Sequence, residues 1–247
     1  MNKGLVFYYL FIFLGAAFAV VAGLYVANRN GLHKKAAAIF VFSGLITGML
    51  GAMLMARIQA LVMNLAGFDF TASNLRIFGG LLFIPIFLIF PVKYLAGDYD
   101  TVTDGMTPGL FGLLGFAKLG CYFNGCCFGI PFSPGVYSVH IDSEVFPVQL
   151  LEAVLCFILS VIMFFVVLKK KHRKGTAYPW ALILYGVVRF VVEYLRYYPE
   201  NERTFFFGVN FWQMFSVISV IAGIIWLICK HYGRSRDLKI SELPCAE

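Results

Sequence analysis

Charged residues are scarce in this sequence: Asp, Glu, Lys and Arg together make up only 13% of its 247 residues. That scarcity, together with 60% hydrophobic residues and a mean hydropathy of +0.81, excludes a soluble domain with a polar surface. The composition therefore predicts an integral membrane protein. A bilayer core about 30 Å thick needs roughly 20 apolar residues per helix, so the chain has room for roughly six to eight spans.

The N-terminal segment lacks a convincing small-residue cleavage site, and its apolar run is too long for the core of a signal peptide. We therefore expect a retained first helix in an all-α, polytopic protein. Apolar runs broken by polar residues indicate seven spans, at about 5–27, 36–62, 76–92, 107–123, 146–168, 178–197 and 209–229. The fourth run is short, so a half-helix or re-entrant element is the alternative there. Residues 1–230 are predicted to form one transmembrane domain, and residues 231–247 a cytoplasmic basic tail.

Positive charge is concentrated at Arg29 with Lys34 and Lys35, in the run 169–174, and in the C-terminal tail. With seven spans these clusters fall on one side of the membrane, and the positive-inside rule assigns that side to the cytoplasm. The N-terminus and the segment 124–145 are then predicted outside, and the C-terminus inside. The net charge of +7 is explained by this topology and by contact with anionic headgroups, so it needs no nucleic-acid partner.

Ionisable side chains inside an apolar span cost free energy and usually face a cavity or a partner. In the segment YGVVRFVVEYLR, spacings of four, four and three residues place four polar side chains on one helical face: Tyr185, Arg189, Glu193 and Arg196. A structural ion pair between Arg189 and Glu193 is one interpretation. The surplus positive charge favours an anionic ligand such as a phosphate, whose oxygens a guanidinium binds bidentately.

Two further polar residues, Gln149 and Glu152, lie three apart in FPVQLLEA, on one face at the start of the fifth span. Hydrogen bonding between helices and the lining of a cavity explain them equally well. Gln213, in the seventh span, is a residue of the same kind.

Three cysteines lie close together in LGCYFNGCCFG, residues 119–129. The chain has only four histidines, so a zinc site is conceivable but poorly spaced; its ligands would be Cys121, Cys126, Cys127 and His140. A disulfide between Cys121 and Cys126, and a low-pKa thiol nucleophile near Lys118, are the other chemical alternatives. Small, soft packing is the commonest role of cysteine in such a run.

The same region carries a family resemblance. The segment LGFAKLGCYFNGCCFG is similar to the signature of the prolipoprotein diacylglyceryl transferase family, roughly Gly-Arg-x-Gly-x-Phe-x-Asn-Gly-x-x-x-Gly; the matching residues are Gly120, Asn124, Gly125 and Gly129. Further elements resemble the family in the same order along the chain: Tyr8, FGGLL at 78–82, FPVQLLE at 146–152, YGVVRFVVEYLR at 185–196 and Gln213. The ordered match covers most of the chain.

The resemblance implies a multi-pass enzyme of the bacterial inner membrane that needs no metal and no cofactor. It would transfer the diacylglyceryl group of phosphatidylglycerol to the lipobox cysteine of a prolipoprotein and release glycerol phosphate. Arg189 would clamp the phosphate, Glu193 would orient that guanidinium, and Lys118 would replace the signature arginine. The substrate cavity would be lined by Tyr8, Gly79, Gly80, Asn124, Gly125, Gln149, Glu152, Tyr185, Arg196 and Gln213.

The sequence departs from the family where chemistry is expected. Phe78 and Phe146 occupy the positions of family histidines, and Met49 that of an arginine. Lys118 keeps the charge of the signature arginine but not its bidentate geometry. His140 is the candidate substitute base, although a lone loop histidine is more often a solvated surface residue. Two functions stay open: the transferase of this family, acting on an anionic phospholipid, and a phospholipid-binding relative that is non-catalytic or uses a cysteine thiol.

Overall fold

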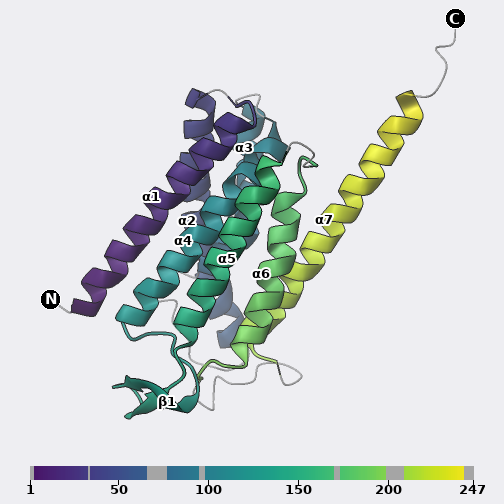
Figure 1. The fold of residues 1–247 in the computed structure, drawn as a ribbon. Helices are drawn as coiled ribbons and strands as arrows, with labels where there is room; N and C mark the ends of the chain where they lie inside the picture. The colour runs from purple at the N-terminus through teal and green to yellow at the C-terminus, as the bar shows by residue number, and fades with distance from the viewer. Residues whose placement is uncertain are drawn as a thin grey trace, which may run out of the picture.

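The computed structural model describes residues 3–32, 34–65, 77–94, 98–169, 173–198 and 209–241. These residues form seven helices and one short antiparallel hairpin (Figure 1). The helices are α1 (Lys3–Arg29), α2 (Lys34–Leu65), α3 (Ile77–Tyr94), α4 (Tyr99–Phe123), α5 (Val148–Leu168), α6 (Ala177–Glu193) and α7 (Phe211–Ser241). The hairpin strands are β1 (Pro131–Ser138) and β2 (Ser143–Val145).

The helices α1, α2, α5 and α7 contain stretches long and apolar enough to cross a membrane, and α3 holds a shorter apolar segment. Large apolar side chains point outward from the bundle: Phe13 and Phe90 are each 70% exposed and Phe165 is 62% exposed. Lipid chains, unlike water, cover such a surface without cost. The protein is therefore an all-α, multi-pass membrane protein, and the number and orientation of its spans stay predictions. α7 continues to Ser241, past the predicted domain boundary at residue 230, which also stays a prediction.

The fourth helix differs from its prediction, because α4 begins at Tyr99 and runs for 25 residues. Asp98 caps its first turn by accepting a hydrogen bond from the Thr101 hydroxyl over 2.6 Å. By hydropathy alone the next turns would be assigned to a loop. They are nevertheless helical and buried. The Thr103 and Thr107 hydroxyls donate hydrogen bonds to backbone carbonyls one turn earlier, which satisfies these polar groups away from water. The helix is therefore longer than the predicted span 107–123, and whether it crosses the membrane stays a prediction.

α4 lies between α1 and α5 and is buried along most of its length (Figure 1). Small residues allow this close packing: a Cβ at Gly109 would lie 2.8 Å from the Ala19 carbonyl oxygen of α1. In Figure 1, α2 lies behind α4 and packs on α3. On the other side of α5, α6 packs on α7.

One end of the bundle brings several helix ends together. The end of α4, the start of α5, the end of α6 and the start of α7 lie near the hairpin, and α1 begins at the same end (Figure 1). The chain after α4 pairs with the chain after α6: Gly129 forms a β-bridge with Arg196, and the Ile130 N–H donates to the Leu195 carbonyl over 3.0 Å. These bonds hold the loop 124–130 against the chain directly after α6.

Candidate functional site

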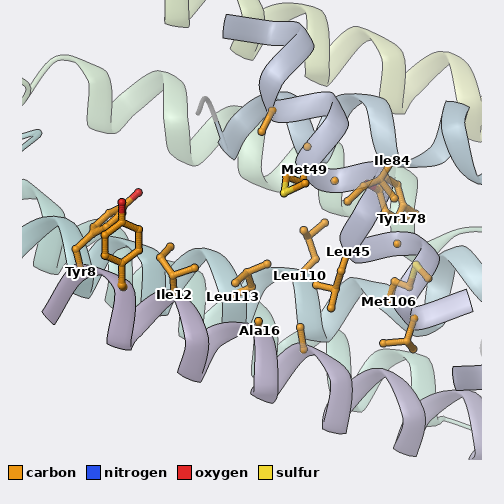
Figure 2. Close-up of a pocket in the computed structure, with 17 residues that line it drawn as sticks. Tyr8, Ile12, Ala16, Leu45, Met49, Ile84, Met106, Leu110, Leu113 and Tyr178 are labelled. Atoms are coloured by element: carbon orange, nitrogen blue, oxygen red, sulfur yellow. The ribbon is translucent and has the colours of Figure 1, made fainter. Parts of the chain in front are cut away.

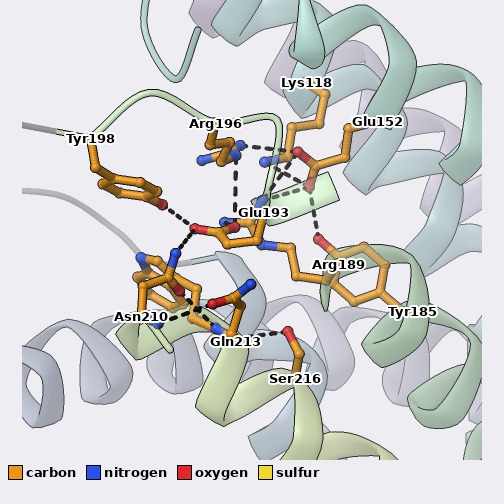
Figure 3. A network of polar contacts seen from close by, with 11 residues as sticks. Lys118, Glu152, Tyr185, Arg189, Glu193, Arg196, Tyr198, Asn210, Gln213 and Ser216 are labelled. Carbon is orange, nitrogen blue, oxygen red and sulfur yellow. Dashed lines mark hydrogen bonds and ion pairs between the residues drawn. The ribbon is translucent and has the colours of Figure 1, made fainter. Parts of the chain in front are cut away.

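Glu152 is the centre of a buried polar cluster (Figure 3). Its carboxylate, near the start of α5, lies 2.9 Å from Lys118 Nζ, 3.3 Å from Arg189 Nη1 and 3.0 Å from Arg196 Nη2. The Tyr185 hydroxyl donates a hydrogen bond to the same carboxylate over 3.3 Å. A fully buried carboxylate stays ionised only with such partners, so the cluster ties α5 to α4 and α6.

Glu193 is a second anionic centre, one helical turn beyond Arg189 on α6. Its carboxylate lies 2.8 Å from Arg189 Nη2 and accepts a hydrogen bond from the Tyr198 hydroxyl. The Asn210 side-chain amide, just before α7, donates to the same carboxylate over 3.1 Å. Arg189 therefore bridges Glu152 and Glu193, which holds its guanidinium in one orientation.

Gln213 reaches this cluster through Asn210. The Asn210 N–H donates to Gln213 Oε1 over 3.0 Å, and the Gln213 N–H donates to Asn210 Oδ1 over 2.9 Å. This reciprocal pair satisfies backbone donors at the start of α7, as a capping box does. Gln213 thus positions the amide that binds Glu193.

The cluster carries unequal charge. Three cations, Lys118, Arg189 and Arg196, face two carboxylates, Glu152 and Glu193, and no side chain of the five is more than 13% exposed. One net positive charge in so buried a place favours an anionic ligand. Arg196 Nε has no hydrogen-bond partner among the described residues and is a donor for such a ligand, since Glu193 Oε2 is 4.0 Å away, too far for a hydrogen bond.

The loop after α4 covers one side of the cluster. Gln149 donates through Nε2 to the Cys126 carbonyl over 2.8 Å, which ties the start of α5 to this loop. Asn124 is the C-cap of α4, and Gly125 follows with a φ of +71°, a left-handed conformation that glycine adopts without strain. These three residues shape the loop, and their contact with substrate stays a prediction.

The three cysteines of this loop come together in space. Their Sγ atoms all lie within 4.8 Å of one another, with Cys121 buried, Cys126 half-buried and Cys127 exposed. All three are free thiols, so the predicted alternative of a disulfide between Cys121 and Cys126 is not formed. Hydrogen bonds with Cys121 and Cys126, and then the charges of Arg196 and Lys118, hold the pKa of Cys127 well below the usual range of a thiol.

An apolar cavity of about 350 Å³ lies between α1, α2, α3 and α4 (Figure 2). Its walls are almost entirely apolar and include Met49, the residue at the position of a family arginine. Tyr8 lies at one end, and Tyr178 at the other (Figure 2). A Cβ at Gly120 would lie 3.1 Å from the Tyr8 carbonyl oxygen, so the Tyr8 end abuts the last turn of α4. Such a cavity suits acyl chains.

Two predicted glycines and one histidine lie outside the cluster. A Cβ at Gly79 would lie 2.2 Å from that of Met55, so helix packing accounts for this glycine, whereas Gly80 lines the cavity. His140 is exposed on the hairpin turn and stacks on the Phe128 ring, with 5.9 Å between centroids. Among the described residues it is not part of the network in Figure 3. Its role as a substitute base stays a prediction.

Phe146 and Phe78 stand at the positions of two family histidines. The Phe146 ring packs edge-on against Phe132, and its carbonyl accepts a hydrogen bond from the Gly129 N–H over 3.0 Å. The Phe78 side chain lies outside the described residues.

Sequence reasoning missed two residues of the cluster, Tyr198 and Asn210. Asn210 stands directly before the apolar run of α7, with Gln213 three residues on, which is the pattern of a helix cap and could have pointed to it. No local signal marks Tyr198, because it follows α6 in an irregular segment.

Asp104 was missed as well, and it positions α6 from another helix. It is buried in α4, where Oδ2 accepts the Gly175 N–H over 2.7 Å and Oδ1 accepts the Ala177 N–H over 2.9 Å. A carboxylate at a helix N-terminus satisfies backbone donors and complements the helix dipole. Asp104 therefore anchors the start of the helix that carries Arg189.

A family model described as prolipoprotein diacylglyceryl transferase matches residues 3–229 of this chain. Phosphatidylglycerol–prolipoprotein diacylglyceryl transferase of Tropheryma whipplei (strain Twist) is 30% identical over 154 residues, covering 57% of this chain and 55% of that protein. The Clostridium tetani (strain Massachusetts / E88) protein of the same name is 23% identical over 222 residues, covering 82% of this chain and 86% of that protein.

The match thus spans about half the length of the Tropheryma relative and most of the clostridial one. The region matched by the family model includes the whole polar cluster, from Lys118 to Gln213, and the cavity lined by Tyr8. Because that match extends over nearly the whole chain, this protein belongs to the prolipoprotein diacylglyceryl transferase family.

Proposed function

We propose that this protein transfers the diacylglyceryl group of phosphatidylglycerol, or of a similar anionic phospholipid, to the lipobox cysteine of a prolipoprotein. The observation that carries the proposal is a buried cluster with one net positive charge at the hairpin end of the bundle, where the Tyr8 end of an apolar cavity abuts the last turn of α4. A phospholipid requires both, cationic donors for its phosphate and apolar walls for its acyl chains. The relatives are named for this donor and this acceptor.

In this reaction the acceptor sulfur attacks the glyceryl carbon that bears the phosphate. The carbon–oxygen bond breaks, glycerol phosphate leaves with the electron pair, and the proton of the acceptor thiol passes to water or to the departing phosphate. Negative charge therefore develops on the leaving phosphate oxygen, where preorganised cations lower the barrier. Lys118 Nζ, which has three N–H donors, and Arg196 Nε are available to that oxygen.

Arg189 is placed differently, because its Nη1 and Nη2 atoms face Glu152 and Glu193. We therefore assign the phosphate contact to Lys118 and Arg196, and a positioning role to Arg189 and Glu193. This assignment refines the expectation that Arg189 itself clamps the phosphate.

We further propose that the protein lies in the bacterial inner membrane with seven spans and its N-terminus outside. The hairpin end, which holds the cluster, would then face the compartment into which prolipoproteins are translocated. Basic residues at the opposite end of the bundle, including Arg29, Lys174 and Lys230, support this orientation.

The test is transfer of labelled diacylglycerol from phosphatidylglycerol to a lipobox peptide by membranes that contain the protein. We expect transfer with the wild type and with Arg57→Gln, whose side chain is exposed on α2. Arg196→Gln should lower the rate by about 100-fold or more, because it removes a donor from the leaving phosphate. Wild-type protein that binds phosphatidylglycerol without any turnover would support the phospholipid-binding relative instead, in keeping with Phe146 and Met49 at positions of family polar residues.

A further inference from the structure

We propose that Cys121, Cys126 and Cys127 form a thiol–disulfide exchange site, which frees an acceptor cysteine from a mixed disulfide with a small thiol. In this site Cys127 attacks the disulfide and Cys121 completes the exchange. The exchange chemistry follows from the arrangement of the three side chains. Its use on the acceptor rests on the proposed transferase function, because that reaction requires the acceptor cysteine as a free thiol.

The three thiols are close enough for two of them to form a disulfide. Their Sγ atoms all lie within 4.8 Å of one another, and a disulfide joins two sulfurs about 2.0 Å apart. Cys121 is held in the last turn of α4, whereas Cys127 lies in the loop that follows. Rotation of the Cys127 side chain, with a small shift of its loop, closes the remaining gap. The pair can therefore pass between dithiol and disulfide while α4 stays folded.

Exposure and hydrogen bonding give the three cysteines different roles. Cys127 is exposed, so a disulfide reaches it from outside the bundle, whereas Cys121 is buried. The Cys126 thiol donates to the Cys121 carbonyl over 3.7 Å. The Cα atoms of adjacent residues are also only about 3.8 Å apart, whereas a disulfide usually spans about 4.4–6.8 Å. Cys121 is therefore the better partner for Cys127 than its neighbour Cys126.

Cys127 has the electrostatic environment of an attacking thiol. The thiolate is the reactive form in disulfide exchange, so the attacking cysteine needs neighbours that stabilise negative charge. Hydrogen bonds with Cys121 and Cys126, and then the positive charges of Arg196 and Lys118, hold the pKa of Cys127 well below the usual range of a thiol. Cysteines that act in redox chemistry typically combine a low pKa, exposure and a second, resolving cysteine beside them.

The backbone of the loop turns the adjacent cysteines back toward α4. The Cys126 N–H donates to the Cys121 carbonyl over 3.1 Å, closing one turn, and Gly125 adopts a φ of +71°. Cys127 itself has a φ of +61°, although it carries a side chain. A left-handed conformation at such a residue costs free energy and is often found at functional sites.

The cysteines adjoin the groups that we assign to the donor lipid. The β-bridge between Gly129 and Arg196 ties their loop to the chain that carries the phosphate donor Nε. Tyr8, at the end of the apolar cavity, lies within electrostatic range of all three thiols. An acceptor sulfur released from Cys127 is therefore released beside the phosphate donor and the lipid cavity.

The exchange takes two steps, in which atoms and electrons balance. The Cys127 thiolate attacks the acceptor sulfur, the bond from that sulfur to the small thiol breaks, and the small thiol leaves as a thiolate with the electron pair. Cys121 then loses its proton to water and attacks the Cys127 sulfur, and the acceptor leaves as a thiolate. Two thiols of the protein are oxidised to one disulfide, while the substrate disulfide is reduced to two thiols. An external dithiol reduces the protein disulfide and resets the site.

The first experiment follows exchange in the absence of lipid. The parent protein is the full-length chain in detergent with Cys229→Ser and Cys245→Ser, so that the loop and the buried Cys156 provide the remaining thiols. After reduction and removal of the reductant, it is mixed with a peptide whose single cysteine is disulfide-bonded to thionitrobenzoate, a coloured small thiol. We expect about one thionitrobenzoate per chain, a free peptide thiol and a protein lighter by two hydrogens.

Three variants of the parent separate the attacking thiol from the resolving one. Cys127→Ser should release thionitrobenzoate at least about tenfold more slowly, because it removes the attacking thiolate. Cys121→Ser should still release it but should retain the peptide as a mixed disulfide, which intact-mass analysis detects. Cys126→Ser is the matched control and should complete the exchange, since its hydroxyl can replace the hydrogen bond of the thiol.

Peptide mapping of the reacted parent gives a readout that does not depend on the folding of any variant. It should locate the new disulfide between Cys121 and Cys127. Release by Cys127→Ser at the rate of the parent, a parent that keeps the peptide attached, or a disulfide between other cysteines overturns the site.

The role toward the acceptor is tested by single-turnover transfer of labelled diacylglycerol from phosphatidylglycerol, with reduced protein in excess. Two lipobox peptides are compared, one with a free thiol and one with its cysteine in the mixed disulfide. The ratio of transfer to the disulfide peptide over transfer to the thiol peptide should fall at least about tenfold in Cys127→Ser. An unchanged ratio overturns this role. Protein that exchanges the disulfide but transfers lipid to neither peptide refutes the proposed function and leaves the exchange site standing.

Discussion

Replacing Glu152 by glutamine tests the cluster most directly, because Glu152→Gln removes one charge and almost no volume. The carboxylate now lies between 2.9 and 3.3 Å from three cations: Lys118, Arg189 and Arg196. In the variant these cations would share only the Glu193 carboxylate. Removing one partner of a buried ion pair typically costs about 3–5 kcal/mol of unfolding free energy. Because the glutamine amide still accepts a hydrogen bond, we expect about 3 kcal/mol.

Thermal unfolding in detergent measures this loss. For a chain of this size each kcal/mol lowers Tm by about 2–4 °C, so Glu152→Gln should unfold about 6–12 °C below the wild type. The matched control is Glu144→Gln, on the exposed strand β2, where the carboxylate accepts a backbone N–H from Gly135 over 3.3 Å. It should stay within about 0.5 kcal/mol of the wild type.

Lipid addition sharpens the same experiment. Phosphatidylglycerol should restore part of the stability lost in Glu152→Gln, since its phosphate supplies negative charge to the cations that have lost their carboxylate partner, and phosphatidylcholine should restore less. Equal Tm values for Glu152→Gln and Glu144→Gln would refute the reasoning that a buried carboxylate holds the three cations together.

Three further predictions concern packing, capping and the phosphate contact. Gly79→Ala should destabilise the protein by about 1–3 kcal/mol, because its Cβ would overlap Met55. The control is Gly105→Ala, whose Cβ would have its nearest neighbouring atom at 3.9 Å and should not destabilise the protein. Equal losses of stability in thermal unfolding would contradict this prediction. Asp104→Ala should lower the free energy of unfolding by about 1–3 kcal/mol, since it leaves buried N–H groups at the start of α6 without acceptors. An unchanged Tm would contradict this and show that water replaces the carboxylate. Arg196→Lys should keep the fold, because it keeps the charge, but should slow diacylglyceryl transfer by about tenfold or more, because it loses the Nε donor. A wild-type rate at an unchanged Tm would show that Arg196 does not contact the phosphate.

The sequence alone determined the membrane setting, the positions of most helices and the polar face of α6. Apolar runs follow from lipid as the solvent, so the predicted span 146–168 agrees with α5 at Val148–Leu168. The helical period places Tyr185 and Arg189 on one face of α6, and in the structure both contact the Glu152 carboxylate; Arg196 contacts it too, but from the chain beyond the end of α6 at Glu193, so the predicted helical face does not extend to it. Local pattern failed at α4, whose first turns are polar yet buried.

Only the tertiary structure decided which groups meet. Glu152 stands 37 residues from Arg189, and Asp104 stands 73 residues from the Ala177 N–H that it caps, separations that no helical period encodes. The three cysteines likewise form one group because the loop turns back on α4. A sequence lists which residues can carry charge or bind a metal, whereas the packing of helices decides their partners, because burial makes an unpaired charge too costly to leave alone.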